Sequence, residues 1–332
     1  MSGALAVRAG RVDWAAWLLV PAVAALVLPA MAFSTWLTLT VAGLAMGMML
    51  FLMASGLTLV FGLMDVLNFA HGGFITIGAF VAVSVLGRLS GWVGSDDAAL
   101  NLLALGAALL AAAGACGIVG WGFERVIVRR VYGSHLRQIL ITVGGLIVAE
   151  QLVIVLWGAE PLPLVKPAVL RGSFVVAGAA VERFRVAASL LGLAVFAAMH
   201  LVLGRTRIGL LVRAGVENRE MVEALGYRVR RLFVGVFVAG SALAGIGGAM
   251  WAVYQELVTP AIGGDMTVLV FIVVIVGGLG SVPGCFAGAV LVGLLSNYAG
   301  FLAPRLALGC NIALMVAVLL WRPRGLFPVA KT

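Results

Sequence analysis

The stretch 56–83, GLTLVFGLMDVLNFAHGGFITIGAFVAV, places polar side chains in the middle of an apolar segment. These side chains are Asp65, Asn68 and His71, and a pair of glycines follows directly. Within a membrane, polar groups and broken helices are tolerated only where protein buries them or water reaches them. Asn68 and His71 are three residues apart and would share one face of a helix. They can contact a zwitterionic solute or hydrogen-bond backbone groups freed by a helix break. The second role is favoured, with Asp65 as the cap of the following helix.

A second polar pair, Glu150 and Gln151, lies deep in the apolar stretch 138–158. An ionised glutamate there needs a partner or a water-filled cavity. Three functions remain open from these residues alone: a hydrogen bond between helices, proton- or sodium-coupled transport through Glu150 or Asp65, and an intramembrane enzyme that combines His71 with one of these carboxylates. The sequence contains no GxSxG serine, no HExxH and no aspartate pair, so the enzyme has no motif to support it.

The composition identifies the protein class in which these residues act. The chain is 63% hydrophobic and 11% charged, whereas soluble domains are about a quarter charged. Apolar blocks of about 20 residues favour an all-α polytopic membrane protein that forms one domain over 1–332. The cysteines are too far apart for a metal site, and no cofactor is expected. We predict ten spans: 14–33, 35–61, 65–87, 98–120, 138–158, 186–204, 232–254, 267–280, 284–300 and 305–321.

The distribution of arginine predicts the orientation. Arginines concentrate in 121–137, in 205–231 and at both ends of the chain, which indicates that these segments and both termini are cytoplasmic. The net charge of +9 is therefore explained by the positive-inside rule and does not point to nucleic acid. The first 33 residues also fit a cleaved signal peptide, but a retained extra span over 1–34 is favoured. The outer loop 159–185 is expected to form a short hairpin around Gly178 and is a candidate docking surface.

The segment 268–293 is a weak echo of 56–83, with GGLGSVPG (277–284) in the place of MDVLNFAHGG. Paired interruptions of this kind often mark a transport pathway. A glycine-rich turn that joins two helices explains GGLGSVPG equally well, and the sequence does not decide between the two.

The cytoplasmic loop 205–231, RTRIGLLVRAGVENREMVEALGYRVRR, predicts a short helix over 219–225. Asn218 is a good N-cap residue and Gly226 a good C-terminal glycine. The helix would gather Met221, Val222 and Leu225 on one face. It is too short to be stable alone and must pack on the membrane domain or on a partner. A solvated positive loop is the simpler interpretation, but the caps and the apolar face favour a docking element.

Four blocks of this sequence resemble the permease subunits of ATP-binding-cassette importers for branched-chain amino acids, the LIV type. These are GLTLVFGLMDVLNFAHG, RAGVENREMVEALGYRVRRLFVGVFVAGSALAGIGGAM, VVIVGGLGSVPGCFAGAVLVG and the C-terminal RPRGLF. They occur in the family's order and spacing over 35–328. The resemblance implies the fold of such permeases, about ten transmembrane helices with a cytoplasmic coupling helix, in a bacterial inner membrane.

The resemblance also implies partners and residue roles. The partners are a second, different permease chain, two cytoplasmic ATP-binding subunits and an extracytoplasmic solute-binding protein. The permease itself would be non-catalytic, and its solute a branched-chain amino acid or a related small organic molecule. The expected ATPase-coupling residues are Arg213, Ala214, Glu217, Asn218, Glu220, Met221, Leu225 and Gly226. The expected residues of the translocation path are Asn68, His71, Gly72, Gly73, Gly277, Gly278 and Gly280.

Overall fold

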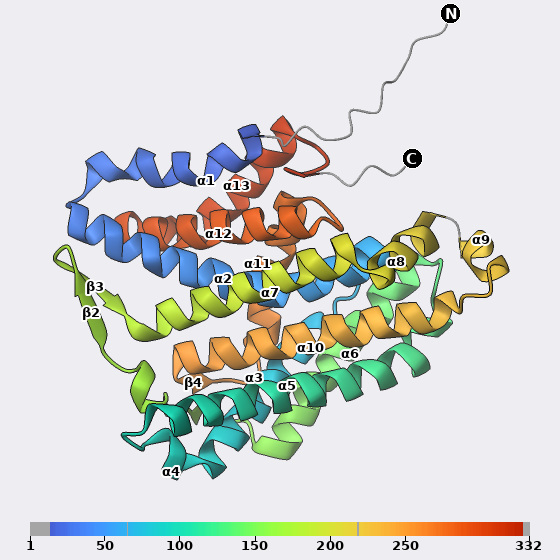
Figure 1. The fold of residues 1–332 in the computed structure, drawn as a ribbon, viewed down its shortest axis with the longest axis horizontal. Coiled ribbons are helices and arrows are strands. Elements are labelled where there is room, and N and C mark those ends of the chain that lie inside the picture. The colour runs from blue at the N-terminus through green and yellow to red at the C-terminus, as the bar shows by residue number, and fades with distance from the viewer. Residues whose placement is uncertain (1–13, 65, 218, 328–332) are drawn as a thin grey trace, which may run out of the picture.

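The computed structural model describes residues 14–64, 66–217 and 219–327, and most of these residues are helical (Figure 1). The helices are α1 (Trp14–Val27), α2 (Phe33–Met64), α3 (His71–Arg88), α4 (Ser90–Val93), α5 (Ala98–Val126), α6 (His135–Trp157), α7 (Arg183–Arg205), α8 (Arg207–Glu217), α9 (Arg219–Ala224), α10 (Val229–Gln255), α11 (Ile262–Gly277), α12 (Val282–Leu302) and α13 (Ala307–Trp321).

The all-α polytopic class predicted from the sequence is confirmed. Seven helices of the described residues are long and apolar enough to cross a membrane, namely α2, α3, α5, α6, α7, α10 and α12. Three shorter apolar helices, α1, α11 and α13, match the remaining predicted spans. The predicted start of the third span at residue 65 is wrong, because α3 begins at His71 and residues 66–70 are not helical. The span predicted over 267–280 begins five residues earlier, at Ile262.

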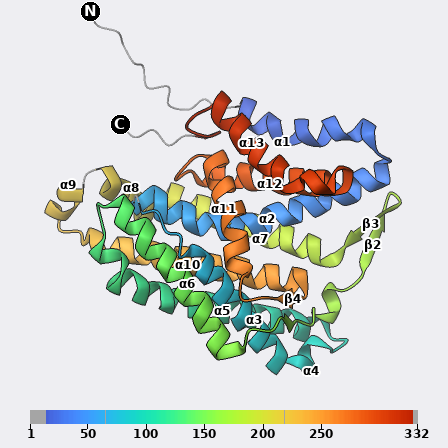
Figure 2. The ribbon, with the colours of Figure 1, turned by 180° about the vertical axis from the view of Figure 1, so that it is seen from behind.

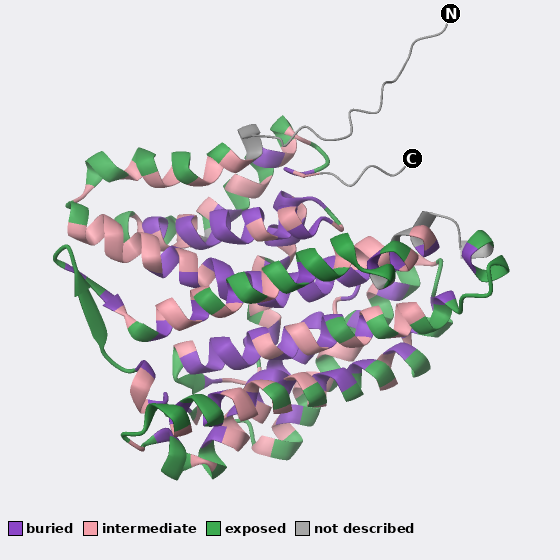
Figure 3. Cartoon of the chain, viewed as in Figure 1, coloured by how far each residue is buried: buried purple, intermediate pink, exposed green. Residues whose placement is uncertain are grey.

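Helix α2 is the central element of the bundle. Of the 18 residues in its most apolar window, 83% are buried, whereas 11% are buried in the corresponding windows of α6 and of α7. Helices α7, α10 and α12 pack around α2, and α3 and α5 pack on the far side of α10 (Figure 2). Colouring by burial shows the same order, with buried residues concentrated in α2, α10 and α12 (Figure 3). The outer helices therefore leave large apolar faces for lipid or for other subunits.

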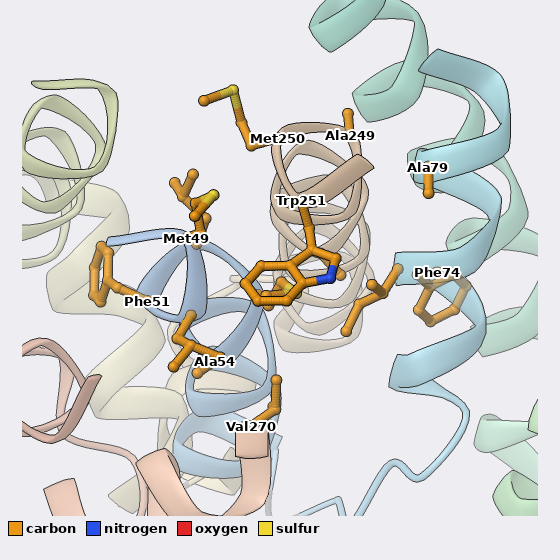
Figure 4. Packing of buried hydrophobic residues seen from close by; sticks show 14 of the residues in the cluster. Met49, Phe51, Ala54, Phe74, Ala79, Ala249, Met250, Trp251 and Val270 are labelled. Atoms are coloured by element: carbon orange, nitrogen blue, oxygen red, sulfur yellow. The ribbon is translucent and has the colours of Figure 1, made fainter. Parts of the chain in front are cut away.

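The core lies where α2, α3 and α10 meet. Trp251 of α10 reaches into the space between α2 and α3, with Ala54 on one side and Phe74 on the other (Figure 4). Phe74 also makes edge-to-face contacts with Phe123 and Phe237, whose ring centroids each lie 6.1 Å from its own. These aromatic contacts join α3 to α5 and α10.

Glycines allow the central helices to approach backbone to backbone. A Cβ added at Gly240 of α10 would lie 2.7 Å from the carbonyl oxygen of Gly56 on α2. A Cβ at Gly248 would collide with the carbonyl of Ile75 on α3. Lipid tails are as apolar as leucine, so membrane helices associate through close packing of small residues of this kind.

The end of the bundle opposite α8 and α9 is held by two small sheets and an ion-pair cluster (Figure 1). Strands β1 (Leu162–Pro163) and β4 (Leu257–Val258) pair antiparallel, and β2 (Ser173–Val176) with β3 (Ala179–Glu182) forms the hairpin predicted around Gly178. The buried ammonium of Lys166 lies 2.7 Å from Glu182 and 2.8 Å from Glu256. Burial lowers the pKa of Lys166, but its hydrogen bonds to the two carboxylates raise the pKa by more, and the net shift is upward. This cation therefore ties the outer loop to the end of α10.

The glycine contact between α2 and α10 makes a specific prediction. Gly240→Ala places a methyl group against the Gly56 carbonyl and is expected to cost about 1–3 kcal/mol through overpacking. A lower melting temperature of the purified protein in detergent would report this cost. Gly235→Ala is the matched control, because it lies on the same helix with no atom within 4 Å of its added Cβ. Equal melting temperatures for the two variants would contradict the packing argument.

Candidate functional site

The predicted helix break is present between α2 and α3. Residues 66–70 run without helical structure before α3 begins at His71. The backbone N–H groups of Leu67 and Phe69 do not enter a helix ladder and need other acceptors. This short segment is therefore a point at which the fold depends on side chains from elsewhere.

Helix α6 supplies those acceptors. The N–H of Leu67 donates to Oε1 of Gln138 over 3.4 Å, and the N–H of Phe69 donates to Oγ1 of Thr142 over 3.1 Å. Gln138 and Thr142 are one helical turn apart and fully buried. The expectation that Asn68 and His71 bind the freed groups is thus wrong. Two polar residues spaced i, i+4 at the start of an apolar span were the available signal.

Asn68 and His71 have a different environment. The Nε2–H of His71 donates to the carbonyl oxygen of Met53 in α2 over 2.8 Å, and this partner assigns the proton to Nε2 because a carbonyl can only accept. Nδ1 of His71 and both amide atoms of Asn68 are buried and have no hydrogen-bond partner among the described residues. His71 therefore pins the start of α3 to the middle of α2, while the Asn68 amide keeps its hydrogen-bonding capacity.

The glycine pair allows two other helices to approach the start of α3. A Cβ at Gly72 would lie 2.6 Å from the carbonyl oxygen of Gly263 in the first turn of α11. The N–H of Gly263 in turn donates to Oγ1 of Thr76 over 3.1 Å. A Cβ at Gly73 would lie 2.8 Å from that of Ala149 on α6. The first turns of α3 and α11 thus meet inside the bundle, as the short helices of interrupted transport domains do.

Glu150 lies beside this crossing. Its Oε1 would lie 3.0 Å from a Cβ added at Gly264, in the first turn of α11. No side-chain hydrogen bond of Glu150 is found among the described residues, and a bond between helices through this residue stays a prediction. A carboxylate near the positive end of a helix dipole gains a favourable interaction without a direct hydrogen bond.

The second predicted interruption is a tight turn between α11 and α12. Gly278 and Gly280 have φ values of +102° and +82°, which only glycine adopts without strain. The Ser281 side chain accepts from the N–H of Gly284 and caps α12. Gly277 packs directly on Gly284, and a Cβ at Gly280 would lie 2.6 Å from the Cα of Gly62 near the end of α2. The two interruptions that the sequence pairs are therefore close in space.

The C-terminal RPRGLF closes over the same turn. The N–H groups of Leu326 and Phe327 donate to the carbonyls of Val276 and Gly277 over 2.9 and 3.0 Å. These carbonyls belong to the last turn of α11, where the helix itself provides no donor. The last motif of the resemblance thus has a structural role.

The loop 205–231, predicted to be cytoplasmic, contains two helices, α8 and α9, of which the sequence predicts only the second. Val212 of α8 and Val222 of α9 are buried and anchor them to the bundle. Met221 and Leu225 are 59% and 69% exposed, so of the three apolar residues of α9 only Val222 is buried. Gly226 has the predicted left-handed conformation with φ +87°, and its N–H bonds the carbonyl of Glu223.

The other expected coupling residues that the structure describes belong to the same two helices. Arg213, Ala214 and Glu217 belong to α8, Glu220 belongs to α9, and Ala214 is partly exposed. Asn218, the predicted N-cap, lies outside the described residues, as does Asp65, the predicted cap before α3.

Comparison with known proteins identifies a family and several similar permeases. The family model described as "Branched-chain amino acid transport system / permease component" matches residues 39–319. The permease protein BraD of Pseudomonas aeruginosa, described as part of a high-affinity branched-chain amino acid transport system, is 28% identical over 290 residues, covering 86% of this chain and 93% of the relative. The corresponding LivH protein of Escherichia coli is 27% identical over 293 residues, covering 86% and 92%. A probable LivH protein of Methanocaldococcus jannaschii is 26% identical, covering 84% and 88%. No solved structure matches.

The bonds from α6 to the helix break can be tested with one hydroxyl. Thr142→Val removes the acceptor for the Phe69 N–H and leaves that donor buried, at a cost of about 1–3 kcal/mol. We expect a lower melting temperature in detergent and faster hydrogen exchange at Phe69. Thr142→Ser keeps the hydroxyl and should retain most of the stability. If the valine and serine variants exchange equally slowly at Phe69, the bond does not hold the break.

Proposed function

Because the chain belongs to the permease family of branched-chain amino acid transport systems, we propose that it forms the membrane path of an ATP-driven importer. The match over residues 39–319 carries this proposal, since it includes the helix break, the cytoplasmic helices and the α11–α12 turn. The permease is a multi-pass membrane protein and a transport subunit. Its proposed solute is a branched-chain amino acid or a related small neutral or zwitterionic molecule, in keeping with the described relatives.

The proposed assembly contains three kinds of protein partner. The chain would join a second, different permease, two cytoplasmic ATP-binding subunits and an extracytoplasmic binding protein in the bacterial inner membrane. The arginine-rich segment 121–137 and α8–α9 lie at one end of the bundle, and the β2–β3 hairpin lies at the other (Figure 1). This separation supports a cytoplasmic face for the ATPases and an outer face for the binding protein. In this proposal both termini are cytoplasmic as well.

The proposed coupling element is the α8–α9 unit. Val212 and Val222 anchor it to α7 and α10, while Met221 and Leu225 point outward from its end. An anchored helix transmits a push from a docked ATPase to the membrane helices, which a flexible loop would absorb. In this proposal the residues from Arg213 to Gly226 form the docking segment, and the exposed methionine and leucine are its apolar contact.

The proposed path runs along the crossing of α3 and α11. Asn68 has both amide atoms buried and unbonded among the described residues, which supports a contact with solute in another state of the transport cycle. His71 is assigned a positioning role through its bond to the Met53 carbonyl. Gly72, Gly73, Gly277, Gly278 and Gly280 would permit the close approaches that such a path opens and closes.

The coupling assignment is tested by replacing the two exposed apolar residues of α9 with charged ones. Met221→Asp together with Leu225→Asp should abolish substrate-stimulated ATP hydrolysis and uptake by the reconstituted complex, because a carboxylate pair cannot enter an apolar groove. The matched control is Met221→Leu with Leu225→Met, which keeps volume and apolarity and should retain transport. Full ATP-driven uptake by an assembled aspartate variant would refute the docking assignment.

The energy source is tested at Glu150. An ATP-driven permease should retain most of its uptake in the Glu150→Gln variant and in the presence of a protonophore, provided that ATP is supplied inside proteoliposomes. An ion-coupled secondary transporter would lose uptake in both cases and would work without any ATPase. Uptake that collapses with the ion gradient while ATP is held constant would favour the second mechanism.

A further inference from the structure

A basic pocket of about 780 Å³ lies at the cytoplasmic end of α5 and α10. Four arginines line it, together with two glutamates and Trp121: Arg125, Arg228, Arg230 and Arg231, with Glu124 and Glu223. It is separate from the helix break and lies beside the coupling unit. Its charge and position raise the question of which anion it accepts.

The start of α10 carries positive charge where a helix tolerates it least. Arg228 is the N-cap residue, and Arg230 and Arg231 belong to the first turn, at the positive end of the helix dipole. The ion pairs found among the described residues involve Lys166, Glu182, Glu256 and Arg185 at the opposite end of the bundle. The three arginines therefore concentrate positive charge at this end of α10, and a bound anion would reduce the repulsion among them and with the dipole.

One of the two glutamates that line the pocket, Glu124, already accepts a hydrogen bond within the chain. Glu124 is 2% exposed, and its Oε1 accepts a hydrogen bond from the hydroxyl of Tyr132 over 3.0 Å. Arg125 next to it stacks over the Trp121 ring, with 5.3 Å between the guanidinium carbon and the ring centroid. The four arginines of the pocket are exposed, so their guanidinium groups are accessible to a ligand outside the chain.

An apolar surface continues from this pocket along α5. Ile118 is 72% exposed, Leu110 is 76% exposed, and Trp121 at 47% marks the boundary where aromatic rings lie at the headgroup level. A soluble anion would use the arginines alone, and an acidic protein segment would leave this face uncovered. A phosphate attached to acyl chains fits both parts.

We propose that the pocket binds the phosphate of an anionic phospholipid, with the acyl chains along the exposed face of α5. Arginine clusters on the cytoplasmic side of membrane helices suit such headgroups, because guanidinium groups form paired bonds to phosphate oxygens. The bound lipid neutralises the start of α10, and thereby stabilises the junction that carries the coupling helices. The site is independent of which solute the permease transports.

The test measures lipid retention rather than transport. The purified complex is incubated with phosphatidylglycerol or with phosphatidylcholine, and bound lipid is counted by native mass spectrometry. We expect the wild type to retain phosphatidylglycerol preferentially, and Arg228→Gln with Arg231→Gln to lower its retention about tenfold. Arg205→Gln with Arg207→Gln is the matched control, since it removes the same charge from the cytoplasmic side outside the pocket.

Two further arms make each outcome decisive. Arg228→Lys with Arg231→Lys keeps the charge but loses the paired guanidinium bonds, so it should retain an amount of phosphatidylglycerol between those of the wild type and the glutamine variant. Retention equal to that of the glutamine variant would show that the charge attracts no lipid and would overturn the proposal. Inorganic phosphate is added at millimolar concentration. If it displaces phosphatidylglycerol completely, or if pocket and control variants retain equal lipid, the pocket is not a lipid site.

Discussion

The fold depends on one constraint of the membrane, that every buried backbone N–H must find an acceptor. Residues 66–70 are not helical, so two of their N–H groups have no helical acceptor, and Gln138 and Thr142 on α6 accept from them instead. Helix α6 is thus fixed to the start of α3 by two bonds, although most of its own surface faces outward. The break allows α3 to begin within the bundle, and its position in turn places His71 against α2 and the glycine pair against α6 and α11.

Close glycine contacts join the start of α3 and the other central helices to one another. Gly72 meets Gly263, Gly62 meets Gly280, and Gly240 meets Gly56. Through these backbone contacts α3 touches α11, and α2 touches both α10 and the α11–α12 turn. Such contacts give dispersion and weak polar interactions where the hydrophobic effect contributes little between helices. Each glycine contact also has two well-defined states: the two backbones are either in contact or apart. A crossing of this kind can therefore switch between discrete arrangements rather than deform gradually.

The sequence predicted the helical class and the ten apolar segments because hydropathy is a local property of about 20 residues. It also placed the hairpin at Gly178 and the glycine at the end of α9, since turn chemistry is local as well. It failed where the decisive contact is distant. Nothing near Leu67 or Phe69 indicates that their acceptors lie about 70 residues later. Helix α8 was missed although its apolar residues recur at helical spacing.

The coupling element shows why anchoring and exposure must be separated. From the sequence, Met221, Val222 and Leu225 form one apolar set. This set spans about 100° of the helix surface, with Val222 at one edge. Val222 faces the bundle and Met221 and Leu225 face away, so the same short helix holds on to the membrane domain and offers an apolar surface. A helix of six residues is not stable by itself. Its motion must therefore follow its anchor, and a force applied at Met221 and Leu225 reaches α10 through Val222 and the junction at Gly226.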